Sequence, residues 1–189
     1  MTCTLAVECL SLGDVTTSGK GAKTAAFSVN EGHADFSLSH MRVAFEPSAF
    51  QDAEATRVNI VFKVDLVREL ELQEIDKWIL DAVAADPVRF FGRHKTAEQL
   101  LESYTPCLKK TEKWGSQFKA KMNLPGSAGG VRVWGADKQA REPPESWAGC
   151  LVKPKIRFRH LYFMGNQWGP VIDVLDLQVL GEPANECPF

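Results

Sequence analysis

The stretch Leu151–Leu180, LVKPKIRFRHLYFMGNQWGPVIDVLDLQVL, decides the fold that we expect. Its first half carries a cation at every second position: Lys153, Lys155, Arg157 and Arg159. Successive side chains of a β-strand point to opposite faces, so these cations would share one face. The opposite face would hold Ile156, Phe158 and Tyr162. The pattern predicts a strand with one basic and one apolar face.

The second half of this stretch predicts a partner strand. Turn-forming residues fill Gly165–Pro170, and Val171–Leu180 is rich in the β-branched and apolar residues that strands favour. The two halves therefore predict a β-hairpin. Four cations on one strand repel each other unless the face is solvated or anions lie nearby, and a phosphate backbone would supply such anions. The hairpin alone leaves both explanations open.

Composition places the chain among ordinary folded domains. It has 189 residues, 44% of them hydrophobic, enough for a real core. Five scattered cysteines without a CxxC pair indicate neither a disulfide framework nor a zinc site and favour a reducing intracellular compartment. No apolar run is long enough to span a membrane. We therefore expect a soluble protein with no membrane partner and no export signal.

Charge is distributed unevenly along the chain. The net charge is −2, but residues 88–160 alone carry +9 and the remainder carries −11. A basic segment flanked by acidic ones indicates a surface that meets an anionic partner.

The N-terminal part predicts loops and strands. Residues 13–24 are small and polar, but their glycine and lysine spacing does not fit a phosphate-binding P-loop, so we expect a flexible loop within a partly flexible segment 1–26. Broken alternation over Phe27–Phe45 indicates a half-exposed strand. Strict period two over Arg57–Leu66 predicts a core strand.

Two helices are expected after that strand. Leu72, Ile75, Ile79 and Val83 form a helical stripe, which predicts a helix over about residues 71–85. Thr96–Gln99 has capping-box spacing and predicts a second helix over about residues 96–104.

The basic segment predicts a second hairpin. Lys119 and Lys121 alternate with apolar residues in Phe118–Met122, and Val131–Trp134 reads as the returning strand. A long loop, 136–149, would follow. We expect a mainly β protein, an OB-fold-like antiparallel barrel with one or two inserted helices, in one domain over residues 1–181.

Cations beside aromatic rings are the ingredients of a site for single-stranded nucleic acid, because phosphates pair with cations and bases stack on rings. Trp114, Trp147 and Trp168 fall in predicted loops near the basic strands, although core packing is the alternative for each tryptophan. The candidate binding residues are Lys109, Lys110, Lys113, Trp114, Lys119, Lys121, Arg132, Trp134, Lys153, Lys155, Arg157, Arg159 and Trp168.

Other chemistry finds little support. The four histidines have no ligand spacing with each other or with cysteines, so no metal and no cofactor is expected. There is no nucleophile elbow. Asp173 and Asp176 on one strand would face opposite sides and could not act as a carboxylate pair. We do not expect an enzyme.

The chain also resembles a known family. Phe90-Phe91-Gly92, Glu98–Lys109 and Phe118–Lys121 look like the single-stranded DNA-binding proteins of large eukaryotic DNA viruses and podovirus-type phages, and the Gly149–Leu180 hairpin resembles their last strand pair. The likeness covers about residues 56–181. It implies an OB-fold barrel with an inserted helix. The matching DNA contacts would be Lys109, Lys119, Lys121, Arg132, Trp134, Lys155, Arg157 and Arg159.

The end of the chain resembles the acidic tip by which many such proteins recruit replication partners. Residues 182–189 form a short tail with Glu186, Pro188 and Phe189, but it has only two acids after Gly181 and Cys187 interrupts the pattern. A tail that docks nowhere is the alternative.

These observations predict a protein that coats and protects single-stranded DNA in replication or recombination, largely independent of sequence, with RNA as an open alternative. Two other functions remain. One is a scaffold in a virion or another large assembly, in which copies of the chain pair acidic with basic faces. The other is a nucleic-acid-processing enzyme.

Overall fold

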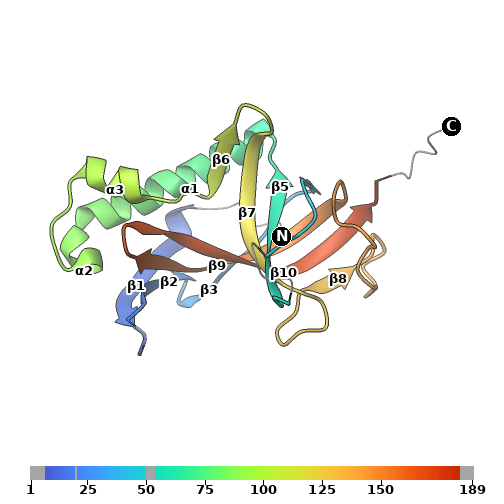
Figure 1. The fold of residues 1–189 in the computed structure, drawn as a ribbon, viewed down its shortest axis with the longest axis horizontal. Coiled ribbons are helices and arrows are strands. Elements are labelled where there is room, and N and C mark those ends of the chain that lie inside the picture. Colours follow the sequence, from blue (N-terminus) through green and yellow to red (C-terminus); the bar gives the residue numbers. More distant parts are fainter. Residues whose placement is uncertain (1–6, 20, 50–53, 184–189) are drawn as a thin grey trace.

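The predicted hairpin consists of the two longest strands of the described residues. The structure is a computed structural model that describes residues 7–19, 21–49 and 54–183. Strand β9 (Leu151–Met164) pairs antiparallel with β10 (Gln167–Gly181) along almost its whole length, so the hairpin is confirmed. The turn is only Gly165-Asn166, shorter than expected, because β10 starts at Gln167. In Figure 1 the hairpin runs from the helical end of the molecule to the end that carries β8.

Five strands close a barrel. β9 pairs with β4 (Met41–Val43), β4 with β5 (Arg57–Lys63), and β5 with β7 (Gly115–Asn123). β7 pairs in parallel with β10, and β10 returns to β9. In chain order the parallel pair joins the third and fifth of these five strands, and the remaining pairs are antiparallel. This arrangement confirms the mainly β, OB-like fold.

The inserted helices follow the second barrel strand, as predicted. α1 (Leu66–Ala85) begins earlier than expected because Asp65 caps it, accepting a hydrogen bond from the Arg68 backbone N–H. The predicted stripe of Leu72, Ile75, Ile79 and Val83 is buried. α2 (Pro87–Phe91) was not expected. α3 (Ala97–Ser103) begins with the predicted capping box, in which Thr96 and Gln99 exchange hydrogen bonds.

The N-terminal part corrects one prediction. A short 3-10 helix (Val7–Cys9) leads into β1 (Leu10–Thr17), which pairs with β2 (Lys23–Val29); β3 (Gly32–Ser37) follows. The flexible loop expected over 13–24 is therefore wrong, apart from the turn between β1 and β2. β2 and β3 both pair with β9, whose length offers an edge beyond the barrel. A polar composition misled the prediction because these strands are half exposed.

The second predicted hairpin is also wrong. β8 (Arg132–Trp134) does not pair with β7; it pairs in parallel with β10, as β7 does. One hydrogen bond, from the Val131 backbone N–H to the Asn123 carbonyl at 3.0 Å, closes the intervening loop. The two strands then diverge and β10 lies between them. β6 (Leu108–Thr111) takes the hairpin position beside β7 instead.

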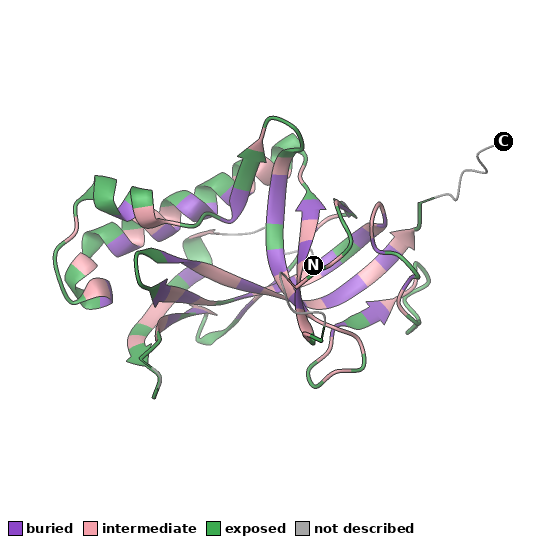
Figure 2. Cartoon of the chain, viewed as in Figure 1, coloured by how far each residue is buried: buried purple, intermediate pink, exposed green. Residues whose placement is uncertain are grey.

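The core lies inside the barrel and beneath the helices. Buried positions alternate with intermediate or exposed ones along β5 and along most of β7 and β9 in Figure 2. Trp147 and Trp168 belong to this core. No helix of the described residues is long and apolar enough to cross a membrane.

Two β-bulges change which side chains share a face. Arg159 is an extra residue in β9, because His160 and Phe158 lie opposite the consecutive residues Val171 and Ile172. In β10 Leu175 is the extra residue, because Asp173 and Asp176 lie opposite Arg157 and Lys155. Each bulge inverts the alternation beyond it.

Candidate nucleic-acid interface

A groove of about 560 Å³ lies where the β9–β10 hairpin leaves the barrel. One side is formed by Lys119–Lys121 of β7, together with Asn59 of β5. The other side is formed by β9 and β10 beyond the Arg159 bulge, including His160, Tyr162 and Gln167. Residues 105–107 line it between the two. The second and third barrel strands, β5 and β7, are the strands whose face binds oligonucleotides in OB-folds generally.

The segment 105–107 closes the free edge of the hairpin. The Thr105 backbone N–H donates to the Trp168 carbonyl at 2.8 Å. At Gly169 the approach is so close that an added Cβ would lie 2.5 Å from the Thr105 carbonyl oxygen. Only glycine fits there, so this side of the groove is held at a fixed position.

The β7 lysines point into the groove because their neighbours fill the barrel. Phe118, Ala120 and Met122 are buried, and the intervening Lys119 and Lys121 face outward. Neither lysine makes an ion pair with a carboxylate of the described residues. The predicted alternation of this strand is confirmed, and it delivers two unpaired cations to one hollow.

A single carboxylate lies among the cations at this site. Asp173 accepts hydrogen bonds from Arg57 at 2.5 Å and from Arg159 at 3.2 Å, and it lies opposite Lys121 in the sheet. Lys119 lies two residues from Lys121 on the same face of β7 and adds a fourth cation to this region. The local charge is positive, which favours an anionic ligand.

Burial and nearby cations together lower the pKa values of two groove residues. Burial lowers the pKa of the Lys121 ammonium, and the charges of Lys119 and Arg57 lower it further, against the opposing effect of Asp173. Burial also lowers the pKa of the His160 imidazole, helped by Arg159. A bound phosphate would favour the charged form of both groups.

Sequence reasoning missed the residues on the β9 side of the groove. Tyr162 was expected on the same face as Phe158, but the Arg159 bulge turns it outward, and Leu161 and Phe163 are buried instead. Its hydroxyl donates to Thr105 Oγ1 at 3.1 Å, which holds the ring beside the groove. No sequence signal announces the bulge. His160 was missed because of the same bulge, and Lys23 was missed because only the pairing of β2 with β9 brings it to the groove.

The β6–β7 hairpin holds the next predicted residues. Lys109 is exposed and lies opposite Gln117, two residues from Lys119, so it shares the sheet face of the groove lysines. Lys110 forms an ion pair with Glu69. At the turn, Lys113 lies 4.8 Å from the centre of the Trp114 ring, which is exposed and packs edge-on against Phe45.

The basic strand of β9 keeps its predicted alternation but lies largely outside the groove. Asp35 of β3 accepts two hydrogen bonds from Arg157, at 2.5 and 2.9 Å, and the hydrogen bond from this guanidinium lowers the pKa of Asp35. Lys153 is exposed and Lys155 half-buried; neither has an ion pair among the described residues. The protein itself thus supplies much of the compensating negative charge.

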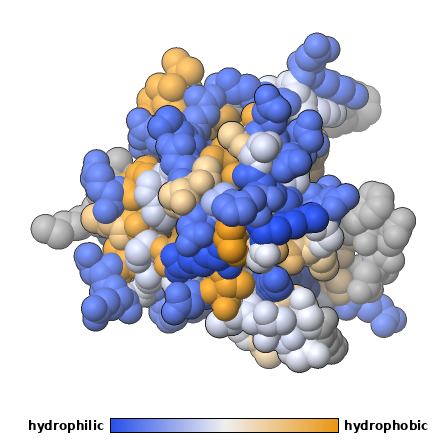
Figure 3. Space-filling model, turned by 90° about the vertical axis from the view of Figure 1, so that its left-hand side faces the viewer, coloured by the Kyte–Doolittle hydropathy of each residue, from blue (hydrophilic) through white to orange (hydrophobic). Residues whose placement is uncertain are grey.

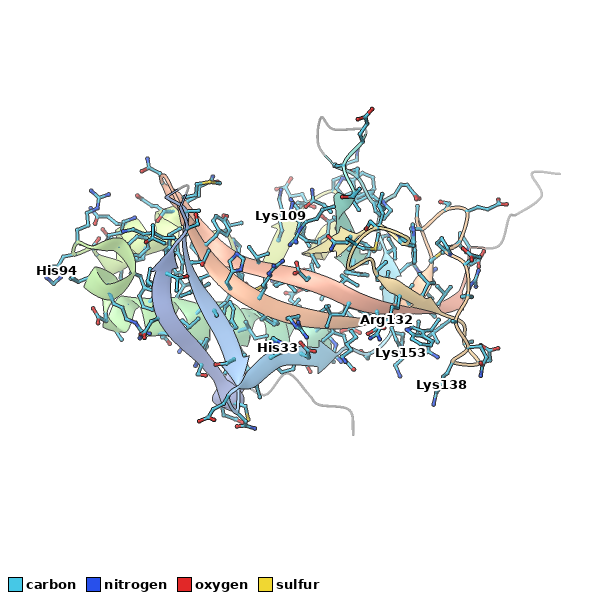
Figure 4. All side chains as sticks on the ribbon, turned by 90° about the horizontal axis from the view of Figure 1, so that it is seen from below. His33, His94, Lys109, Arg132, Lys138 and Lys153 are labelled. Atoms are coloured by element: carbon cyan, nitrogen blue, oxygen red, sulfur yellow. The ribbon has the colours of Figure 1, made fainter. Side chains whose placement is uncertain are left out.

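The two candidate residues of β8 also contact a carboxylate of the protein itself. Arg132 forms an ion pair with Asp176 at 2.7 Å, and the Trp134 indole N–H donates to the same carboxylate at 2.9 Å. Because of the Leu175 bulge, Asp176 shares a face with Asp173, contrary to the prediction that they face opposite sides. Each of these two carboxylates forms an ion pair with arginine. Figure 4 shows Arg132 and Lys153 at the β8 end of the molecule and Lys109 nearer its middle.

Trp168 corrects a site prediction. It was expected in a loop at the rim, but its ring is fully buried among Phe91, Tyr104 and Phe163. Its indole N–H donates to the Leu100 carbonyl at 3.0 Å. No ring face is left for a base, so Trp168 joins the hairpin to the helices instead. The tail residues Glu186, Pro188 and Phe189 lie outside the described residues.

Within the described ranges, no group of three or more histidine, cysteine or acidic side chains is placed to hold a metal ion. The Asp176 and Asp35 carboxylates are engaged by arginines. The groove is lined by Lys23, Lys119 and Lys121, with no Asp or Glu among its described lining residues, and its chemistry is that of an anion-binding groove.

Comparisons with known proteins give a match of fold. No family model matches the chain, and no curated protein is significantly similar to it in sequence. Among solved structures it is similar to the single-stranded DNA-binding protein from bacteriophage Enc34 in complex with single-stranded DNA. That match has a TM-score of 0.54 and 11% identity, and it covers 91% of this chain and 96% of the other. The chain shares the fold of that protein.

The same phage protein in another structure gives a TM-score of 0.53 at 13% identity, covering 95% of this chain and 96% of the other. Both matches span nearly the whole chain. The fold implied by the resemblance to phage-type single-stranded DNA-binding proteins is thereby confirmed.

Proposed function

We propose that this protein binds single-stranded DNA in the groove and coats it stoichiometrically, without catalysis and largely without sequence preference. One observation carries the proposal: Lys119 and Lys121 meet in a hollow and form no ion pair with a carboxylate among the described residues, and burial together with the charges of Lys119 and Arg57 lowers the Lys121 pKa. Phosphates would relieve the repulsion between these cations and release counterions. The likeness to a phage protein in complex with single-stranded DNA supports the same ligand.

The mechanism follows from the geometry of the groove. Lys119 and Lys121 line the groove and neutralise phosphates, Arg57 and Arg159 lie beside it in ion pairs with Asp173, and the Tyr162 ring offers a surface for a base. Base stacking on aromatic rings is tolerant of sequence because every base has a π-face. A strand held this way is kept from pairing again.

The decisive experiment compares labelled single-stranded DNA, duplex DNA and RNA of equal length at two salt concentrations. We expect tight binding to single-stranded DNA that weakens steeply with salt. Equal affinity for the duplex, or binding that salt does not change, would contradict the proposal. RNA binding as tight as DNA binding would widen the ligand to both, since the sequence offers no recognisable 2′-hydroxyl contact.

Further parts of this proposal concern partners. The tail of Glu186, Pro188 and Phe189 would recruit replication proteins, and copies of the chain would associate on DNA. Such a protein would act inside the cell, which agrees with the free thiols of Cys9, Cys107 and Cys150. Gel filtration with and without oligonucleotide tests the scaffold alternative, because a large assembly indifferent to DNA would favour that role.

A further inference from the structure

The groove continues beyond the hairpin tip into two more hollows. A hollow of about 300 Å³ shares Lys23, Phe163, Met164 and Gln167 with the groove. A third, of about 390 Å³, shares Arg93, Lys95 and Asn166 with the second. The three hollows therefore adjoin one another from the barrel to the helices, and together we call them the channel.

Cations dominate the new part of the channel. Its lining includes Lys23, Arg93 and Lys95, with Glu102 as the acidic residue. None of these three cations forms an ion pair within the described ranges. Figure 3 looks onto this helical end and shows strongly hydrophilic side chains on both sides of hydrophobic ones, and Figure 4 places His94 at its tip.

The loop that carries these residues is fixed at both ends. Gly92 ends α2 in the left-handed conformation, with φ +71°, and its backbone N–H donates to the Val88 carbonyl at 2.8 Å. Thr96 starts α3 through the capping box. Arg93, His94 and Lys95 are thus displayed on a short loop whose own caps do not use them. Arg93 and Lys95 form no ion pair within the described ranges, which favours an anion at this loop.

An aromatic cluster holds this loop in a fixed relation to the groove. Phe90 and Phe91 of α2 pack on Phe163 of β9, with ring centres 5.7 and 5.2 Å apart. Phe91 also packs on Trp168 at 5.9 Å. On the channel side, Lys95 lies 4.3 Å above the Phe91 ring, and Met164 is 70% exposed. The channel therefore offers apolar surface beside cations, the combination that binds unpaired bases and phosphates.

We propose that Lys23, Arg93, His94 and Lys95 form a second contact region, so that a bound single strand runs from the barrel groove past the hairpin tip to the helices. This inference rests on the proposed function and extends it. A single-stranded nucleic acid fits better than an acidic peptide because the second hollow shares Lys23 and Met164 with the groove and places Phe91 and Met164 beside its cations.

The test uses the full chain and two labelled oligothymidylates, one of about 5 and one of about 16 nucleotides, the range of site sizes for an OB-fold. The variant Arg93→Gln/Lys95→Gln removes two channel cations. Its control, Lys77→Gln/Lys138→Gln, removes two exposed cations, from α1 and from the loop after β8, that do not line the channel. Thermal melting checks that every variant is folded.

We expect the channel variant to bind the long oligonucleotide about 25-fold more weakly at 0.1 M salt, with a salt slope smaller by about 1.4, because each phosphate contact on a single strand contributes about 0.7 to that slope. The short oligonucleotide and the control should be unaffected. An unchanged long-oligonucleotide affinity would overturn this inference alone, as would weakened binding of polyglutamate without a change for DNA. A wild type that binds neither oligonucleotide would overturn the proposed function itself.

Discussion

Replacing the two groove lysines is the sharpest test of how this protein binds. The variant Lys119→Gln/Lys121→Gln removes two cations that line the groove, while the barrel interior is untouched because both side chains point outward. If each lysine neutralises one phosphate, the salt slope on single-stranded DNA falls by about 1.4. At 0.1 M salt this corresponds to about fivefold weaker binding per lysine and about 25-fold for the pair.

Fluorescence anisotropy titrations across a series of salt concentrations measure both quantities. A matched comparison is Lys153→Gln/Lys155→Gln, which also removes two cations without ion pairs among the described residues, but from the β9 face outside the groove. If the strand followed the continuous basic face that the sequence suggests, this second variant would weaken binding equally. A groove variant with wild-type affinity and salt slope would refute the assignment of the groove.

Two further predictions concern pH and stability. Burial and Arg159 lower the pKa of His160 in the free protein, and a bound phosphate would raise it, so DNA binding takes up a proton. The affinity for DNA should therefore increase as the pH falls from 7.5 toward 5. In titrations at fixed salt, His160→Gln should remove that increase. Asp76 is buried in α1 and accepts hydrogen bonds from the Tyr104 hydroxyl (2.6 Å) and from the backbone N–H groups of Cys107 (2.8 Å) and Leu108 (3.2 Å). Asp76→Ala leaves these donors unpaired and should lower the free energy of unfolding, measured with denaturant, by about 2–5 kcal/mol. Asp81→Ala, at an exposed residue of the same helix, should lower it by less than about 0.5 kcal/mol. Equal losses for both aspartates would contradict the role given to Asp76.

Local patterns were reliable where neighbouring residues settle the structure. The hairpin of β9 and β10, the core strand β5, the stripe of α1 and the capping box of Thr96 all follow from interactions between residues close in sequence. The errors occurred where distant partners decide. β1 and β2 are polar enough to resemble a loop, yet β2 gains the edge of β9 as a partner.

The candidate site divides in the same way. Lys119 and Lys121 were found because simple alternation holds on β7. Tyr162 was missed and Trp168 misplaced because a bulge and an early strand start reverse the expected orientation on β9 and β10. Arg93 and Lys95 carry no strand pattern, and only the packing of α2 against Phe163 brings their loop beside the hairpin tip.

The sequence by itself determined that a mainly β protein forms, with cations alternating along some strands and with inserted helices, because strand period and helix capping are properties of neighbouring residues. The tertiary structure decided which cations are free for a ligand. Arg132 and Arg157 of the basic strands meet Asp176 and Asp35 across the sheet, whereas Lys119 and Lys121 meet none of the described carboxylates in an ion pair. Charge pairing between strands depends on register and bulges, and these are fixed only when the barrel closes.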